Sequence, residues 1–117
     1  MPCDFRTIRS GVVELPTDGD ADITIEFPAP GIDAELHAIL MYRARKVCEP
    51  FDRPTRIGVS LNGKALFEQS VTDPTGHSFH EVLDTKILRP TGNELTLIRK
   101  SDTGTVHLAD LVLIYSI

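Results

Sequence analysis

The chain of 117 residues is 41% hydrophobic and 25% charged, which is typical of a globular protein and excludes a disordered, collagen-like or coiled-coil chain. Its length predicts a single domain over residues 1–117 with a sizeable core. The formal net charge of −5 argues against a nucleic-acid partner, because a phosphate backbone is bound through concentrated Lys and Arg side chains.

The N-terminal part of the chain predicts three short strands and one long strand. Residues 4–9 and 11–15 are short strand candidates, and the turn residues at 16–20 reverse the chain before a strand at 21–27. Residues 34–45 form the longest strand-like run. The middle of this run is apolar on both faces, which predicts a central strand covered on both sides.

Basic residues gather near the end of this long strand, at Arg43, Arg45 and Lys46. Acidic residues interleave with the other basic residues of the chain. We therefore interpret this group as the solvated end of a strand rather than as a binding site for nucleic acid.

The clearest local signal is Asn62-Gly63, which stands between strand candidates at 55–61 and 64–71. The pair supplies the two positive-φ residues of a type I′ turn, which predicts an antiparallel hairpin. Residues 55–117 as a whole, with short period-two strands closed by turn residues, predict an all-β sandwich. Its further elements are strands at 77–84, 93–99 and 105–117, and an irregular or 3₁₀ turn at 85–88.

The last strand changes its period-two phase. Val106 and Leu108 are in one phase, whereas Leu111 and Leu113 are in the other. A β-bulge near Asp110 would bring both sets onto the core. Alternatively, both faces of this strand are buried.

Four segments together resemble the second half of galactose-binding-domain-like jelly rolls, a fold that includes many non-catalytic carbohydrate-binding modules. They are residues 59–64 (VSLNGK), 79–82 (FHEV), 88–97 (LRPTGNELTL) and 106–113 (VHLADLVL). The resemblance implies a jelly-roll sandwich that acts as a standalone binding module. Carbohydrate is the commonest ligand of that family, and protein and lipid partners are also represented. The matching motifs mark turns of the scaffold rather than a ligand site.

Candidate ligand-binding residues are few. The chain has no Trp, although carbohydrate recognition usually relies on an aromatic platform that stacks on the sugar ring. Phe51, Arg53 and Arg56 form the candidate site, because arginine makes bidentate contacts with the carboxylate of an anionic sugar. The alternative is a loop anchored by Phe51 and flanked by solvated arginines.

One carboxylate cluster has spacing suited to a metal. Asp18, Asp20 and Asp22 alternate in a turn and offer the oxygen ligands that Ca²⁺ prefers. Calcium sites occur in the family that the chain resembles, and the final strand contributes to them there, which implies that Asp110 joins the cluster. Turn-forming Asp and Gly chemistry explains the same run equally well, so both interpretations stay open.

No group of side chains predicts catalysis, and we expect no enzymatic activity. His77 and His80 are three residues apart and so lie on opposite faces of a strand, and the serines lack the surroundings of an activated nucleophile. The N-terminus lacks a basic segment followed by an apolar run, so neither a secretory signal nor a membrane partner is expected. Cys3 and Cys48 are interpreted as reduced thiols of a cytoplasmic protein, unless a signal peptide was removed.

The sequence therefore predicts a non-catalytic binding module, most simply for carbohydrate. The alternative is a structural or interaction protein that self-assembles, or binds a protein partner, through an apolar sheet face. Ile39, Met41, Val112 and Ile114 remain apolar after the core residues are assigned. A patch of this kind predicts a homo-oligomer built sheet to sheet.

Overall fold

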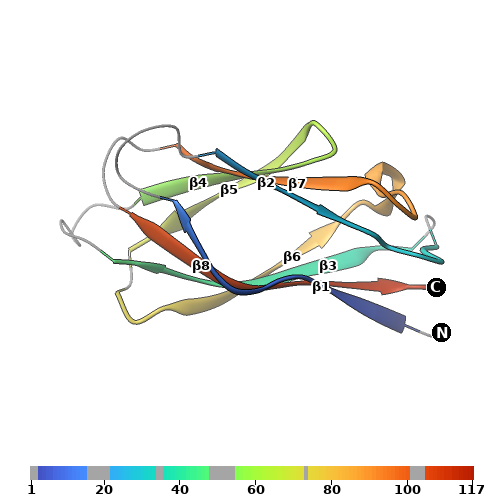
Figure 1. Cartoon of the computed structure of the whole chain (residues 1–117), viewed down its shortest axis with the longest axis horizontal. Coiled ribbons are helices and arrows are strands. Elements are labelled where there is room, and N and C mark those ends of the chain that lie inside the picture. The colour runs from blue at the N-terminus through green and yellow to red at the C-terminus, as the bar shows by residue number, and fades with distance from the viewer. Residues whose placement is uncertain (1–2, 16–21, 34–35, 48–54, 73, 101–104) are drawn as a thin grey trace.

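The computed structural model arranges β-strands in two four-stranded antiparallel sheets that face each other (Figure 1). It describes residues 3–15, 22–33, 36–47, 55–72, 74–100 and 105–117. Sheet A has the strand order β1-β8-β3-β6, and sheet B has the order β2-β7-β4-β5. The all-β sandwich predicted from the sequence is confirmed.

The strands of sheet A are β1 (Cys3–Leu15), β8 (Val106–Ser116), β3 (Ala38–Lys46) and β6 (His77–Leu83). The strands of sheet B are β2 (Asp22–Phe27), β7 (Asn93–Arg99), β4 (Thr55–Leu61) and β5 (Lys64–Val71). The predicted 3₁₀ turn is η1 (Thr85–Ile87). Among the described residues there is no helix long and apolar enough to cross a membrane.

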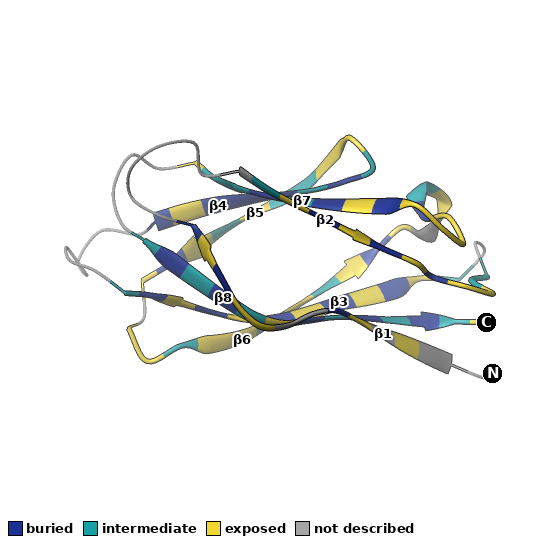
Figure 2. Ribbon diagram, in the orientation of Figure 1, coloured by how far each residue is buried: buried dark blue, intermediate teal, exposed yellow. Residues whose placement is uncertain are grey.

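Period-two alternation buries one face of each sheet against the other sheet (Figure 2). In β3, Ala38, Leu40, Tyr42 and Ala44 are buried, and the residues between them are exposed. The strand is central in sheet A, between β8 and β6, as predicted. The prediction that it is covered on both sides is wrong for the described part of the chain, because Met41 on its outer face is 40% exposed.

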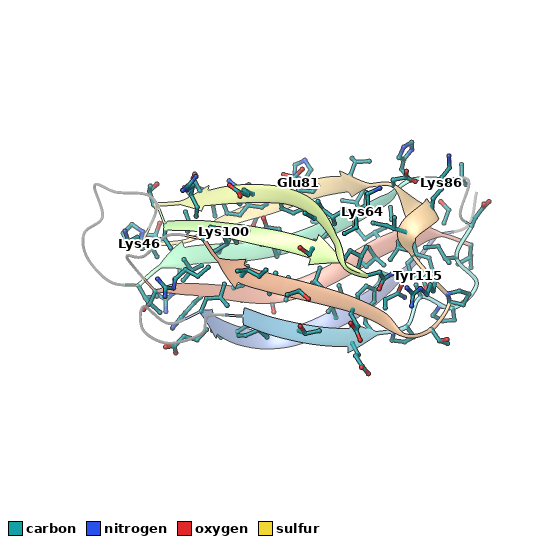
Figure 3. The ribbon with its side chains drawn as sticks, turned by 90° about the horizontal axis from the view of Figure 1, so that it is seen from above. Lys46, Lys64, Glu81, Lys86, Lys100 and Tyr115 are labelled. Atoms are coloured by element: carbon teal, nitrogen blue, oxygen red, sulfur yellow. The ribbon has the colours of Figure 1, made fainter. Side chains whose placement is uncertain are left out.

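Figure 3 places Tyr115 and Lys46 near opposite ends of the sandwich. Tyr115 is buried near one end and donates a hydrogen bond to the carbonyl oxygen of Pro30 at 3.1 Å. Lys46 lies near the other end and is 0% exposed, although it follows the exposed Arg45 directly. The inward direction of Lys46 results from the same alternation, since adjacent residues of a strand point to opposite faces.

The hairpin predicted at Asn62-Gly63 is confirmed. Asn62 has φ of 52° and Gly63 has φ of 80°, and β4 and β5 are antiparallel neighbours. Positive φ at both central residues is what a type I′ turn requires. The turn therefore sets the pairing of Leu61 with Lys64 and of Ser60 with Ala65, and the register shifts by one residue between Ser60 and Val59.

Two asparagines of the motifs that carried the family resemblance tie this hairpin to the turn before β7. The Asn62 side-chain amide donates to the carbonyl oxygen of Ile87 at 2.5 Å and to Asn93 Oδ1 at 3.1 Å. The buried Asn93 also accepts from the Arg89 backbone NH at 2.8 Å. A buried amide with its hydrogen bonds satisfied rigidifies its surroundings. These motifs act as scaffold, as the resemblance implied.

Of the two explanations left open for the last strand, the structure shows the β-bulge. Between Met41 and Arg43 of β3 the partner residue moves from Val112 to Ala109, so β8 carries one extra residue there. Asp110 has φ of 54°, which only a few non-glycine residues adopt. The bulge places Val106, Leu108, Leu111, Leu113 and Tyr115 on one buried face.

The two short strands predicted at 4–9 and 11–15 form a single strand, β1. Its pairing with β8 shifts register between Thr7 and Arg9 and again between Arg9 and Val12. Gly11 has φ of 87° at the second shift. The break seen in the sequence is therefore an irregularity within a strand, because glycine lets the chain bend without ending the ladder.

Candidate functional site

The residues first proposed as a ligand loop are largely outside the described part of the chain. Phe51 and Arg53 fall in the stretch 48–54, which the structure does not describe. Arg56 is exposed on β4, and its Nη1 lies 3.9 Å from Glu68 Oε2 on β5. Exposed pairs of this kind contribute little to stability. The proposed loop site stays a prediction.

The proposed calcium site also stays a prediction. Asp18 and Asp20 lie outside the described residues, and Asp22 is the first residue of β2 in sheet B. Asp110 lies on β8 in sheet A. Within the described residues, no group of three or more His, Cys, Asp or Glu side chains is placed to hold a metal ion. Cys48 is likewise not described.

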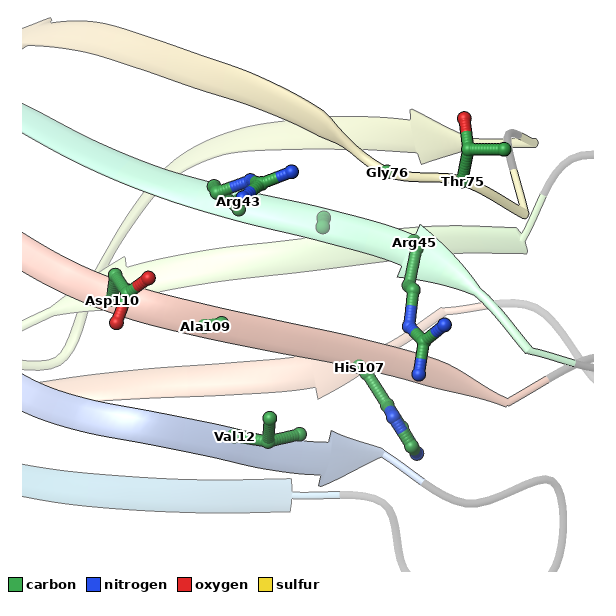
Figure 4. A pocket seen from close by; sticks show the side chains of 9 residues that line it. Val12, Arg43, Arg45, Thr75, Gly76, His107, Ala109 and Asp110 are labelled. Atoms are coloured by element: carbon green, nitrogen blue, oxygen red, sulfur yellow. The ribbon is translucent and has the colours of Figure 1, made fainter.

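Sheet A carries a shallow depression of about 250 Å³ on its outer face, next to the bulge (Figure 4). Residues of β1, β3 and β8 and of the turn before β6 line it. They are Val12, Arg43, Ala44, Arg45, Thr75, Gly76, His107, Ala109 and Asp110. Its volume is below the roughly 300–1,000 Å³ of pockets for drug-sized ligands, so it suits one sugar ring or the end of a chain.

Strand pairing determines which side chains meet in this depression. Arg43 and Arg45 are two residues apart on β3, so both project from its outer face. Ala109 stands opposite Arg43, and Val12 stands opposite Ala109. His107 stands opposite Arg45. The small Ala109 leaves the space, and Val12 gives it an apolar wall.

The turn before β6 forms another wall because Gly76 passes close to β3. A Cβ added at Gly76 would lie 3.6 Å from Arg45 Cβ, 3.7 Å from the Ala44 carbonyl oxygen and 3.9 Å from Arg43 Nη2. Gly76 also has φ of 98°, which side-chain-bearing residues rarely adopt. The space would admit a Cβ, so it is the positive φ that favours glycine in this turn beside the arginines.

The depression is cationic in an acidic protein. In Figure 4, Arg45 extends toward His107, and Asp110 stands at the far end. His107 Nε2 lies 3.4 Å from Glu14 Oε2, and Glu14 is the residue opposite it on β1. Among the described residues, Arg43 and Arg45 form no salt bridge. The fixed charge of two guanidiniums thus faces solvent inside a concave surface.

Sequence reasoning found Arg43 and Arg45 but interpreted them as a solvated strand end. Their period-two spacing was the available signal, because it places both side chains on one face. Val12, His107 and Ala109 were missed. No local pattern marks them, since each reaches the depression through pairing with a strand far away in the sequence.

The other half of the same face is apolar. Phe5, Ile114, Ile39 and Val82 are aligned across all four strands of sheet A by the registers of neighbouring strands. Phe5 and Val82 are each 63% exposed, and Ile39 is 36% exposed. Met41 and Val112 face each other in the adjacent row. We call Phe5, Ile39, Met41, Val82, Val112 and Ile114 the apolar half, and Arg43, Arg45 and His107 with their surroundings the basic half.

No family model and no curated protein sequence matches this chain. Solved structures do match it. A family 35 carbohydrate-binding module from an environmental isolate has a TM-score of 0.67 at 11% identity, over 95% of this chain and 77% of that chain. A family 35 module from Clostridium thermocellum gives 0.62 at 12% identity, over 98% and 88%.

A third match has the same architecture over its full length. The CBM36-1 domain of a multidomain xylanase, from the hindgut metagenome of Trinervitermes trinervoides, has a TM-score of 0.62 at 10% identity, over 99% of this chain and 98% of that chain. At these identities the likeness shows the fold alone. It confirms the predicted resemblance to the jelly-roll sandwich of carbohydrate-binding modules.

Proposed function

We propose that this protein is a non-catalytic carbohydrate-binding module and that its ligand lies in the depression of the basic half. The depression itself is the observation that carries this function. It combines an apolar wall at Val12 and Ala109 with hydrogen-bonding groups at Arg43, Arg45 and Asp110. A sugar presents the same combination, with C–H faces and hydroxyl groups on one small ring. The fold shared with carbohydrate-binding modules supports the function.

A glycan array followed by calorimetry tests this function. Ala109→Leu places a larger side chain in the centre of the depression and should abolish binding of every saccharide that the unmodified protein retains. Ala65→Leu is the matched control, because Ala65 is exposed on β5 in sheet B. Retention of glycans by the Ala109→Leu protein, with its melting curve unchanged, would place the ligand elsewhere.

The apolar half favours a second function, self-association through sheet A. Its two rows contain no Asp, Glu, Lys or Arg side chain that would have to be desolvated against a second copy, since they consist of the apolar half with Thr7 and His80. The patch extends across all four strands, and an extended exposed apolar patch marks an interaction surface. Two copies related by a two-fold axis would cover each other's apolar half with the same residues.

Light scattering with a charge substitution tests the assembly. Met41→Glu should convert a dimer to a monomer without unfolding it, because an unpaired carboxylate in the interface costs several kcal/mol. Ala65→Glu adds the same charge to the outer face of sheet B and should leave the assembly intact. An unmodified protein that is monomeric at high micromolar concentration would contradict self-association.

A further inference from the structure

The charge of the depression is opposite to that of the whole protein. The chain has a formal net charge of −5, yet Arg43 and Arg45 line a depression whose lining contains a single carboxylate, that of Asp110. A concave surface concentrates the field of the charges that line it. The depression therefore favours an anionic group over a neutral one.

The two arginines are suited to hold such a group between them. They stand two residues apart on one strand, so their Cα atoms are about 6–7 Å apart and both guanidiniums reach the same side of the sheet. Guanidinium is planar, keeps its charge at every working pH and binds carboxylate or sulfate oxygens in pairs. Among the described residues, neither arginine is neutralised by a salt bridge.

Asp110 gives the opposite end of the depression a different chemistry. The positive φ of 54° at the bulge holds this exposed residue at the rim. A carboxylate accepts hydrogen bonds from hydroxyl groups and repels a second anion. A ligand with an acidic group at one end of a ring and hydroxyl groups at the other would satisfy both ends of the depression.

We infer that the depression selects a saccharide that carries a carboxylate or sulfate group, with that group between Arg43 and Arg45 and a ring hydroxyl on Asp110. This rests on the proposed function and adds the chemical class of the ligand. The apolar wall at Val12 and Ala109 contacts the ring.

Titration calorimetry with matched ligands tests the selectivity. The ligands are a hexuronic-acid disaccharide, a 6-O-sulfated hexose disaccharide of the same linkage, the unsubstituted hexose disaccharide and sodium sulfate. At low salt, at least one acidic saccharide should bind about tenfold or more tightly than the neutral disaccharide, because it gains charge-assisted hydrogen bonds. The acidic saccharide that binds shows whether the depression prefers a carboxylate or a sulfate group. Added salt should weaken the preference for the acidic over the neutral saccharide.

Variants then assign the selectivity to residues. Arg43→Gln and Arg45→Gln should each weaken binding of the acidic saccharide about tenfold and change binding of the neutral one little. Arg89→Gln is the matched control, since Arg89 is exposed in the turn before β7. Arg56→Gln tests the loop site predicted from the sequence. Melting curves confirm that each variant is folded.

The outcomes separate the ligand class from the function. Equal affinity for acidic and neutral disaccharides would overturn the selectivity and leave the carbohydrate-binding function standing. Binding of no saccharide at all would overturn both. Sulfate that binds as tightly as the acidic disaccharides would show an adventitious ion only. Loss of the preference in Arg56→Gln, but not in Arg43→Gln, would move the ligand to the loop.

Discussion

The two halves of the outer face of sheet A are built by the same strands but have opposite chemistry. On β3, the exposed residues are Ile39 and Met41 in the apolar half and Arg43 and Arg45 in the basic half. The buried residues that alternate with them are hydrophobic. The first charged residue on the buried face of β3 is Lys46, at the end of the basic half. The fold therefore constrains one face of the sheet and leaves the other free to acquire function.

The bulge marks the boundary between the two halves. Asp110 interrupts β8 after His107 and Ala109 of the basic half and before Val112 and Ile114 of the apolar half. On the buried face the bulge has the opposite effect, because it keeps Leu108 and Leu111 in one continuous core. The extra residue of the bulge thus keeps the buried face of β8 continuous and separates the two halves of the outer face.

The largest loss of stability is expected from the buried residue next to the basic half. Lys46 is 0% exposed and has an interaction partner. Lys46→Ala would leave that partner unsatisfied and a void in the core, which should cost at least about 2 kcal/mol of unfolding free energy. Arg45→Ala, one residue earlier and exposed, should cost less than about 0.5 kcal/mol. Urea denaturation measures both, and equal losses would show that Lys46 is not part of the core.

The next largest effect should come from disturbing the boundary. Asp110→Val puts a β-branched residue at φ of 54° and should cost about 1–3 kcal/mol. Asp110→Gly places at the same position a residue that adopts positive φ without strain, so it should change the unfolding free energy much less. The two unfolding curves test whether the conformation, rather than the carboxylate, matters for the fold. A stable Asp110→Val protein would mean that the bulge can move along β8.

Two buried tyrosines beneath the face should respond differently to loss of the hydroxyl group. Tyr115 donates a hydrogen bond to Pro30, so Tyr115→Phe should cost about 1 kcal/mol. The Tyr42 hydroxyl is buried without a hydrogen-bond partner in the described structure, so Tyr42→Phe should be neutral or stabilising. The ring of Tyr42 stacks on Phe79 in either case. A loss of unfolding free energy in Tyr42→Phe as large as that in Tyr115→Phe would show that the Tyr42 hydroxyl has a hydrogen-bond partner.

Tyr42 also makes stability depend on alkaline pH. Burial, and next the charge of Glu81, raise the pKa of the Tyr42 hydroxyl far above its ordinary value of 10.0. Above that ordinary value the unfolded chain ionises Tyr42 while the folded chain keeps it neutral, so its contribution to stability is complete below pH 10 and declines as pH rises further. When unfolding free energy is plotted against pH, Tyr42→Phe should reduce the decline at alkaline pH. An identical decline in both proteins would contradict this assignment.

The smallest effect is expected at the edge of the apolar half. Val82 is 63% exposed on β6, so Val82→Ser should change the unfolding free energy by less than about 0.5 kcal/mol in dilute solution. In the assembly the same substitution should weaken association, which sedimentation at rising concentration measures. A large loss of stability in dilute solution would show that the apolar half supports the monomer itself.

The fold was largely predictable because its signals are local. Asn62-Gly63 requires positive φ at two adjacent residues, and no information from the rest of the chain is needed to expect a hairpin. The phase change around Asp110 likewise indicates either a bulge or a strand buried on both faces, and it does so from one strand alone. The wrong prediction that β3 is covered on both faces has a different origin. Ile39 and Met41 have the composition of core residues, and a hydrophobic residue at the surface looks the same in the sequence as one in the core.

By itself, the sequence determined most strands, the hairpin and the resemblance to a jelly roll, and it gave the bulge as one of two alternatives, since φ preferences and period-two patterns act between near neighbours. Only the tertiary structure decided which face of β3 is buried, and with it that Lys46 points inward while Arg43 and Arg45 point outward. It also decided that Val12 of β1 and Ala109 of β8 share a depression with Arg43. The physical reason is that strand register sets these neighbours, and register depends on packing of the whole sheet rather than on any one segment.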